Sequence, residues 1–363
     1  MEYLFPAIIF GGLLVGLAAA LTVAEKLLVN YGICRIDVNA GDRELDVDGG
    51  QSLLSALNES KIFIPSACGG RGSCGYCKVT VLSGGGPVLP TETPFLTRAE
   101  VRSGVRLACQ VKVREDIEIK IPEDFLNVKL FTAEVASLRK LTHDMVEATF
   151  TLQEPAEISQ RAGQYIQLQA PSAEGMVSRA YSISSPPSDT GSVQIVVRLV
   201  PEGIGSTYVH NLNEGDVVTF TGPYGDFRLN EDPGAGIICV GGGSGMAPLK
   251  NVAMTVLERW PERECWLFFG CRATGDVFYL DEFEELAKKH PNFKVVYALS
   301  EPEEGSDWSG ETGFIHLSLG THLETSDRKR QAFMCGPPPM IEAVMKVLEE
   351  KGLDPDDMFY DEF

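Results

Sequence analysis

The sequence predicts three folded domains behind an apolar N-terminal helix: an α+β domain, an antiparallel β-barrel and an α/β domain with a parallel sheet. The helix is predicted by an uncharged run of 21 residues at 3–23. The barrel is predicted by six short apolar runs separated by Gly and Pro, and the α/β domain by strands that alternate with helical segments. We expect the domain boundaries to be 1–30, 31–127, 128–232 and 233–363.

The composition is that of a folded chain with room for several cores. The 363 residues are 44% hydrophobic and 23% charged, which is ordinary for globular domains. The net charge of −20 argues against nucleic acid as a partner, because the phosphate backbone would be repelled. Of the nine cysteines, four share one pattern, and we interpret most of the others as small buried residues in a reducing compartment.

The apolar run at residues 3–23 is just long enough to span a lipid bilayer. A helix rises about 1.5 Å per residue, and the hydrocarbon layer is about 30 Å thick. A cleaved signal peptide is the alternative, but no basic segment precedes the run. Lys26 and Arg35 follow it, so the positive-inside rule predicts a single-pass anchor in the cytoplasmic membrane with the large C-terminal part in the cytoplasm.

Residues 31–127 combine short strands with one helix. We expect strands at 34–38, 44–47, 78–82 and 105–113, a helix at 52–57, and a linker at 122–127. The first two strands alternate in polarity and predict a hairpin. This mixture, in about 95 residues, predicts a β-grasp domain of the ferredoxin type.

A cysteine pattern lies inside this domain. Three thiols lie inside one glycine-rich stretch of ten residues, and a fourth follows later in the chain: Cys68, Cys74, Cys77 and Cys109. Glycines let the backbone curl around an inorganic centre, and four thiolates are what a [2Fe–2S] cluster requires. Zinc also binds four thiolates, but its sites usually have two C-x2-C knuckles and this chain has one. Disulfides suit crowded cysteines of this kind poorly.

The sequence of the second domain predicts a flavin site on its strands. We expect strands at 128–137, 145–152, 165–170, 179–184, 193–200 and 217–222, with a helix at 207–212. One strand carries the pattern R-x-Y-S at Arg179, Tyr181 and Ser182. The Arg can neutralise a pyrophosphate, the Tyr can stack on the flavin ring, and the hydroxyl can reach the flavin N5 region.

A glycine-rich loop opens the helix of this domain. It contains Gly205, Ser206 and Thr207. Unpaired N–H groups and the helix dipole favour a phosphate there, although an ordinary N-cap is the alternative. Because the loop and the R-x-Y-S strand belong to one predicted barrel, we expect FAD to bind here.

The third domain carries a second glycine loop. We expect strands at 236–240, 265–269, 293–299, 331–334 and 358–360 and helices at 247–259, 280–290 and 337–351. The first strand runs into a loop that would approach a pyrophosphate: Gly241, Gly242, Gly243, Gly245 and Met246. It departs from G-x-G-x-x-G, because Met246 replaces the third glycine. A later strand ends in Cys335, Gly336 and Pro337, at the edge where ligands bind such sheets.

These motifs, in this order, resemble the F subunits of sodium-translocating NADH:quinone oxidoreductases, and the last two domains resemble the wider ferredoxin–NADP reductase superfamily. The resemblance implies that the four cysteines bind the cluster and that Gly243 and Gly245 line the nicotinamide nucleotide. It also implies that Cys335 and the terminal Phe363 flank the hydride path beside the flavin contact Ser182. The chain departs from the family in one place, because only eight residues separate Ala170 from Arg179, where a long insertion is usual.

The resemblance implies a membrane-anchored NADH dehydrogenase with FAD and one [2Fe–2S] cluster, acting with membrane subunits on quinone. The first alternative is a reductase that feeds an oxygenase, which needs no anchor. A second is a pump subunit whose span conducts ions, but the span has no ionisable side chain after Tyr3. An electron carrier that is not an enzyme is opposed by the nucleotide motifs. We expect NADH rather than NADPH, because Asp276 lies near Arg272 and would repel a 2′-phosphate.

Overall fold

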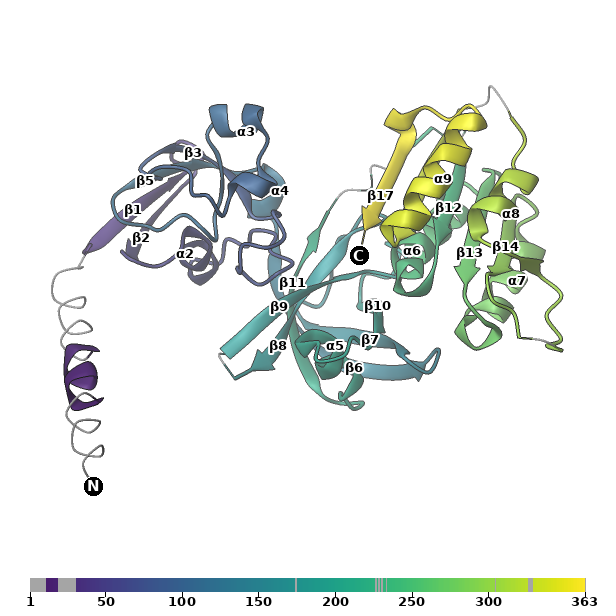
Figure 1. Ribbon diagram of the computed structural model, residues 1–363, viewed down its shortest axis with the longest axis horizontal. Helices are drawn as coiled ribbons and strands as arrows, with labels where there is room; N and C mark the ends of the chain where they lie inside the picture. Colours follow the sequence, from purple (N-terminus) through teal and green to yellow (C-terminus); the bar gives the residue numbers. More distant parts are fainter. Residues whose placement is uncertain are drawn as a thin grey trace, which may run out of the picture. The chain divides into compact units, whose positions relative to one another are not determined.

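The computed structural model describes residues 11–18, 31–173, 175–225, 227, 229, 231–232, 234–303, 305–325 and 329–362 (Figure 1). The chain divides into two compact units, Met1–Asn127 and Val128–Phe363. Residues 11–18 are helical and exposed, and the rest of the predicted span at residues 3–23 lies outside the described residues. Among the residues described, no helix has the length and apolar character needed to cross a bilayer.

The first unit is built on a five-stranded sheet in the order β2-β1-β5-β3-β4. Its strands are β1 (Ile33–Val38), β2 (Arg43–Asp48), β3 (Lys78–Ser83), β4 (Val105–Leu107) and β5 (Ile117–Lys120), and its α-helices are α2 (Leu53–Glu59), α3 (Arg98–Arg102) and α4 (Glu123–Leu126). β1 forms the predicted antiparallel hairpin with β2 and pairs in parallel with β5. The alternation in β1 buries Cys34, Ile36 and Val38 in one core with α2, whose N-terminus is capped by Ser52.

The predicted strand at residues 105–113 was too long. β4 ends at Leu107, where the carbonyl accepts hydrogen bonds from the N–H groups of Gln110 and Val111, so the chain turns. Residues 111–113 then bond to the segment before α2 through Leu53 and Gln51 instead of continuing the sheet. This turn takes Cys109 off the strand and beside the cysteine loop. The sequence prediction also missed β5, which fills the centre of the sheet.

The second unit begins with six strands that are antiparallel throughout, in the order β10-β7-β6-β11-β8-β9. They are β6 (Lys129–Lys140), β7 (Met145–Glu154), β8 (Tyr165–Ser172), β9 (Gly175–Ser182), β10 (Ser192–Arg198) and β11 (Val217–Tyr224), with helix α5 (Ile204–His210). An isolated bridge between Ile183 and Ile195 joins the two end strands and closes the barrel. Phe131, Phe150 and Phe220 fill its interior.

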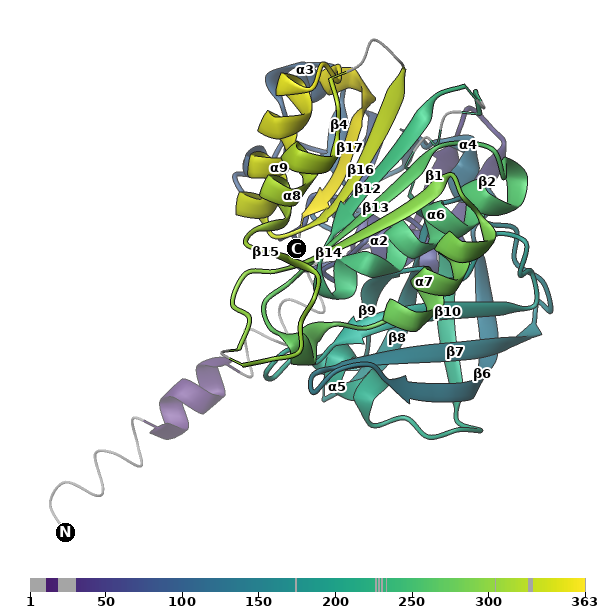
Figure 2. The same ribbon diagram turned by 90° about the vertical axis from the view of Figure 1, so that its right-hand side faces the viewer.

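The rest of this unit is a parallel sheet in the order β15-β14-β13-β12-β16-β17. Its strands are β12 (Gly236–Gly241), β13 (Cys265–Cys271), β14 (Phe293–Leu299), β15 (Glu311–Thr312), β16 (Arg330–Gly336) and β17 (Met358–Glu362). Its α-helices are α6 (Met246–Arg259), α7 (Leu280–Lys289), α8 (Ile315–His322) and α9 (Pro338–Glu350). Figure 2 shows α6 and α7 on one face of the sheet and α8 and α9 on the other, and each pair has its own core.

One strand of this sheet, β15, and one of its covering helices, α8, were absent from the prediction. β15 has only two residues, and α8 begins at Ile315 after the N-cap residue Phe314, which makes no side-chain cap hydrogen bond, so neither leaves a strong signal in the sequence. The strand order places β12 between β13 and β16. The chain therefore leaves β12 toward one edge and later returns to its other side, which makes the β12–β16 boundary the switch point where ligands bind.

A buried carboxylate joins the barrel to helices α6 and α7. Glu147 of β7 is 4% exposed and binds Arg139, Lys250 (3.2 Å) and the hydroxyl of Tyr279. Because each charge is paired, the cluster avoids the cost of an isolated buried ion. The contact fixes the parallel sheet against the barrel within the second unit.

Candidate functional site

The structure brings the four predicted cysteines together as two pairs. The Sγ atoms of Cys68 and Cys74 are 3.4 Å apart, and Cys77 donates a hydrogen bond to Cys109. Among the residues that the structure describes, no three His, Cys, Asp or Glu side chains gather around one metal-sized point. Two pairs suit a binuclear cluster, because each iron binds two thiolates, whereas zinc needs all four sulfurs around one centre.

Four glycines let the loop close around these sulfurs. Gly69, Gly70, Gly72 and Gly75 have φ values of 67°, 84°, 74° and 73°, a region that favours glycine. The backbone thereby directs N–H groups of Arg71 and Ser73 at the sulfur of Cys68. Such donors stabilise thiolates and the negative charge of a cluster.

The hydrogen bonds divide the thiols by acidity. The bond from the Cys77 thiol is the main cause that lowers the pKa of Cys109 to about 6, and the same bond is the main cause that raises the pKa of Cys77. Burial works to raise the pKa of Cys68, but hydrogen bonds from Ser73 and Cys74 outweigh it and lower the pKa to about 7. In each pair one thiol thus has a lowered pKa, which favours the thiolate form that metal ligands require.

The predicted glycine loop of the barrel is the first turn of α5 rather than a loop before it, because Gly205, Ser206 and Thr207 lie within the helix Ile204–His210, and Gly205 meets the R-x-Y-S strand directly. A Cβ atom at Gly205 would lie 2.6 Å from the hydroxyl of Tyr181 and 2.7 Å from Cγ of Arg179. Tyr181 and Ser182 are half-buried on β9, and burial raises the pKa of Tyr181 to about 12, so its hydroxyl is neutral. Only a residue without a side chain allows α5 to approach β9 this closely.

Ser206 and Thr207 differ from one another in their surroundings. The Ser206 hydroxyl accepts from the N–H of Val200 (3.1 Å) and donates to the carbonyl of Gly203 (3.2 Å), so it holds its own loop together. Thr207 is exposed, and its N–H bonds back to Gly203. Gly203 is the N-cap of α5, which leaves the N–H groups of the first turn without partners inside the helix.

The second glycine loop lies at the switch point of the parallel sheet. Gly241 pairs with Cys335 in the register of β12 and β16, which places the two predicted segments side by side. A Cβ at Gly242 would lie 2.6 Å from the carbonyl of Gly270, and Gly243 has a φ of 56°. Gly245 and Met246 are buried where the 3₁₀ turn Gly243–Gly245 meets α6.

Cys335 has no exposed surface in the structure. Its thiol is 0% exposed among residues packed under α6, and burial raises its pKa well above the ordinary value, aided by the Asp361 carboxylate. Gly336 is also buried, and Pro337 is exposed as the N-cap of α9. Phe363 lies outside the described residues, so its position against the flavin stays a prediction.

The sequence prediction missed Arg198, which lies beside the second glycine loop. This residue ends β10 just before Gly203, and its guanidinium lies 3.8 Å from a Cβ built at Gly243. Asp144 holds the side chain through a 3.0 Å hydrogen bond. Both glycine segments thus contact the same barrel strand, and the cation at the end of that strand lies beside Gly243. A lone Arg at a strand end gives no signal that could have revealed this.

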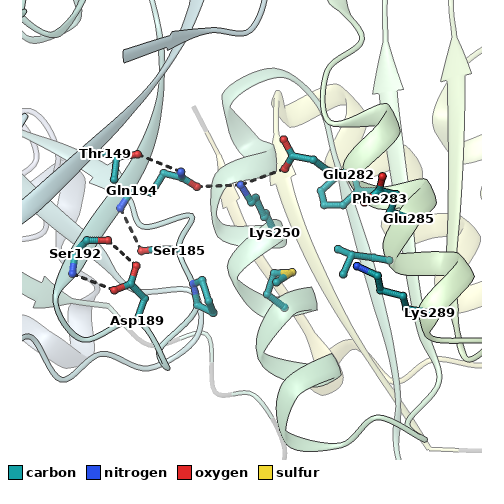
Figure 3. A pocket seen from close by; sticks show the side chains of 13 residues that line it. Thr149, Ser185, Asp189, Ser192, Gln194, Lys250, Glu282, Phe283, Glu285 and Lys289 are labelled. Carbon is teal, nitrogen blue, oxygen red and sulfur yellow. Dashed lines mark hydrogen bonds and ion pairs between the residues drawn. The ribbon is translucent and has the colours of Figure 1, made fainter. Parts of the chain in front are cut away.

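A cavity of about 400 Å³ lies elsewhere between the barrel and helices α6 and α7. Lys250 reaches across it between Gln194 (2.9 Å) and Glu282 (3.8 Å), as Figure 3 shows. None of the cofactor residues predicted from the sequence lines this cavity. Its polar groups hold the two sheets of the second unit together.

Three family models match successive parts of the chain. The 2Fe-2S iron-sulfur cluster binding domain matches residues 34–114, the oxidoreductase FAD-binding domain residues 132–229, and the oxidoreductase NAD-binding domain residues 239–346. The chain therefore has the domains that bind the predicted cofactors, a [2Fe–2S] cluster, FAD and a nicotinamide dinucleotide.

Similar solved structures contain the same succession of folds. The cytochrome P450 reductase GcoB of Amycolatopsis has a TM-score of 0.73 at 31% identity and covers 91% of this chain and 98% of its own. The ferredoxin reductase in carbazole 1,9a-dioxygenase has a TM-score of 0.69 at 26% identity, with 92% and 98% covered.

Curated relatives match the chain from end to end. The F subunit of the Na(+)-translocating NADH-quinone reductase of Neisseria meningitidis serogroup C is 35% identical over 405 aligned positions, and all of both chains is covered. The corresponding protein of Klebsiella pneumoniae is 33% identical over 406 positions, again with full coverage. The order of domains, the paired cysteines and these full-length matches agree, and the chain belongs to the family of Na(+)-translocating NADH-quinone reductase F subunits.

Proposed function

We propose that this chain is the NADH-oxidising, membrane-anchored component of a sodium-translocating NADH:quinone reductase. The observation that carries the proposal is the full-length match to the F subunits of such reductases, together with the two glycine segments that contact β10. Bound FAD supplies the conversion of two-electron hydride transfer from NADH into single-electron transfer to the [2Fe–2S] cluster. Partner membrane subunits would then carry the electrons to quinone.

The residues of the first unit hold the cluster. The pairing of sulfurs supports Cys68 and Cys74 as ligands of one iron and Cys77 and Cys109 as ligands of the other. We propose 31–127 as the extent of this domain, 128–232 for the FAD domain and 233–363 for the NAD domain, after an anchor at 1–30.

The residues of the second unit orient the two nucleotides. Arg179 neutralises the flavin pyrophosphate beside the first-turn N–H groups of α5, while Tyr181 packs on the ring and Ser182 hydrogen-bonds near N5. The glycine loop from Gly241 to Met246 would hold the NADH pyrophosphate, with Arg198 as its counter-charge. Cys335, Gly336, Pro337 and Phe363 border the nicotinamide.

The choice of NADH over NADPH is proposed to depend on Asp276. Its carboxylate accepts from the N–H of Ala273 (3.2 Å) in the loop after β13, close in sequence to Arg272. A fixed negative charge there opposes a 2′-phosphate.

We expect Gly205→Ala to weaken FAD binding by about tenfold or more, which is about 1.4 kcal/mol. The added methyl group would displace Tyr181 and Arg179 from their places at the proposed flavin site, since atoms of both side chains lie within 2.7 Å of the new Cβ atom. Flavin content after purification and fluorescence titration of the apoprotein measure the effect. Gly191→Ala is the matched control in the same barrel, because its Cβ meets nothing within 4 Å. Equal affinities for the two variants would refute the proposed site.

Removing residues 1–24 tests the anchor and the role in the complex. We expect the full chain in the membrane fraction and the shortened chain in the soluble fraction, because the apolar run provides no cofactor ligand. The shortened chain should oxidise NADH with ferricyanide at the full rate but fail to restore NADH:quinone activity to membranes that lack this protein. A shortened chain that loses the ferricyanide reaction would show that the segment does more than anchor.

A reductase that serves a soluble oxygenase is the second candidate. The direct hairpin between β8 and β9, where Ser172 pairs with Gly175, favours it, because F subunits usually carry an insertion there. If the full chain restores quinone reduction to membranes that lack this protein, and passes no electrons to a soluble oxygenase component, the membrane complex is the right assignment.

A further inference from the structure

The side-chain amide of Gln110 donates a hydrogen bond to the sulfur of a proposed cluster ligand. Its Nε2 lies 3.5 Å from Sγ of Cys109, the residue before it. Its Oε1 accepts from the hydroxyl of Thr91 at 2.9 Å. Because Thr91 occupies the amide oxygen, the amide nitrogen is turned toward the sulfur.

A buried ion pair fixes the loop that carries Thr91. Glu92 and Arg106 are 0% and 5% exposed and are joined by hydrogen bonds as short as 2.7 Å. Arg106 also donates to the carbonyls of the loop at Gly85, Gly86 and Pro87, while the carboxylate of Glu92 accepts from the N–H groups of Leu89 and Leu107. The pair thus ties this loop to β4, and Thr91, the residue before Glu92, is held beside Gln110.

The cysteine loop closes over the same amide. A Cβ at Gly72 would lie 2.5 Å from Nε2 of Gln110, and the N–H of Gly72 bonds to the sulfur of Cys109. The amide is therefore packed between the cysteine loop and the sulfur it bonds. A donor that is held in place acts on charge more strongly than one that rotates in water.

We propose that Gln110 is a positioning residue that raises the reduction potential of the [2Fe–2S] cluster through its N–H···S bond to Cys109. The inference rests on the proposed role of Cys109 as a ligand. Reduction adds a negative charge that spreads onto the ligand sulfurs, so a donor to sulfur stabilises the reduced cluster more than the oxidised one. Gln110 thereby favours transfer of electrons from the flavin to the cluster, in a chain whose net charge of −20 works the other way.

Potentiometric titration of the full-length holoprotein, followed by the electron paramagnetic resonance of the reduced cluster, tests this. Gln110→Leu keeps the size of the side chain but removes the donor. We expect its midpoint potential to fall, with about a tenfold change in the reduced-to-oxidised ratio at fixed potential, or 59 mV for a one-electron couple. Thr91→Val frees the amide to rotate and should shift the potential the same way by less. The flavin potential should not change in either variant.

Gln51→Leu is the matched control in the same unit, since that amide donates to the exposed carboxylate of Glu59. An unchanged cluster potential in Gln110→Leu overturns the proposal, and if that variant fails to assemble a cluster, an unchanged potential in Thr91→Val overturns it instead. Cys109→Ala separates this result from a wrong ligand assignment: a normal cluster in Cys109→Ala would reject the ligand, whatever the Gln110 variants do.

Discussion

Cys74→Ala is expected to abolish the [2Fe–2S] cluster and leave FAD bound. Its sulfur is paired with that of Cys68 at 3.4 Å, and one iron would lose half of its protein ligands. The FAD residues belong to the other compact unit, so their packing does not depend on this loop. Iron content, the visible spectrum and flavin content measure the outcome, and NADH should still reduce artificial two-electron acceptors.

Cys34→Ala is the control for this variant. Cys34 is also a buried thiol of the first unit, but it lies on β1 and donates to the carbonyl of Tyr31 at 3.7 Å. This variant should keep both cofactors. Loss of flavin together with iron in Cys74→Ala would contradict the independence of the two units.

The features that the sequence could predict are those encoded by short segments. The cysteine loop needs positive φ at Gly69, Gly70, Gly72 and Gly75. These glycines and three of the four cysteines therefore occur together within ten residues of the sequence, as one recognisable pattern. The glycine loop after β12 is local in the same way. The family models support the cofactors that these two motifs imply.

The features that the sequence could not predict depend on distant residues. Glu147 is stabilised by Lys250 and Tyr279, more than a hundred residues away in the chain, and no local pattern marks such a partner. Arg198 becomes a candidate ligand only because the barrel places the end of β10 beside Gly243. The central strand β5 was missed because it has four residues, and its place is decided by pairing with β1 and β3.

Cys335 shows that a strand-end motif can predict where a thiol lies in the sheet but not whether its sulfur is exposed. The sequence places this thiol at the carboxyl end of a strand, and the structure agrees that it lies at the switch point beside Gly241. Its sulfur is nevertheless fully buried. A direct contact with nicotinamide would therefore require a change in what covers the thiol, and this is a matter of packing that no strand-end motif encodes.

Arg106→Ala is expected to destabilise the first unit by ~3–5 kcal/mol, because it leaves the carboxylate of Glu92 buried without its partner. Urea titration of the holoprotein, followed by cluster absorbance, would show this as a midpoint lower by roughly 2 M for an m-value of about 2 kcal/mol per molar. Arg35→Ala is the matched control. Arg35 pairs with Glu44 at 3.4 Å, but both side chains are 57% exposed, so its loss should cost only ~0–1 kcal/mol.

The difference between wild type and Arg106→Ala should also depend on pH in one direction. Burial works to raise the pKa of Glu92, but hydrogen bonds from Arg106 and from the backbone at Leu89 and Leu107 outweigh it and lower the pKa below the ordinary value. A carboxyl whose pKa is lower in the folded state contributes stability above its unfolded pKa of about 4.3 and loses it as the pH falls. The gap in urea midpoint should therefore be full at pH 7 and shrink below about pH 4. A gap that stays constant into acid, or one no larger than that of Arg35→Ala, would mean that the buried pair does not hold this domain together.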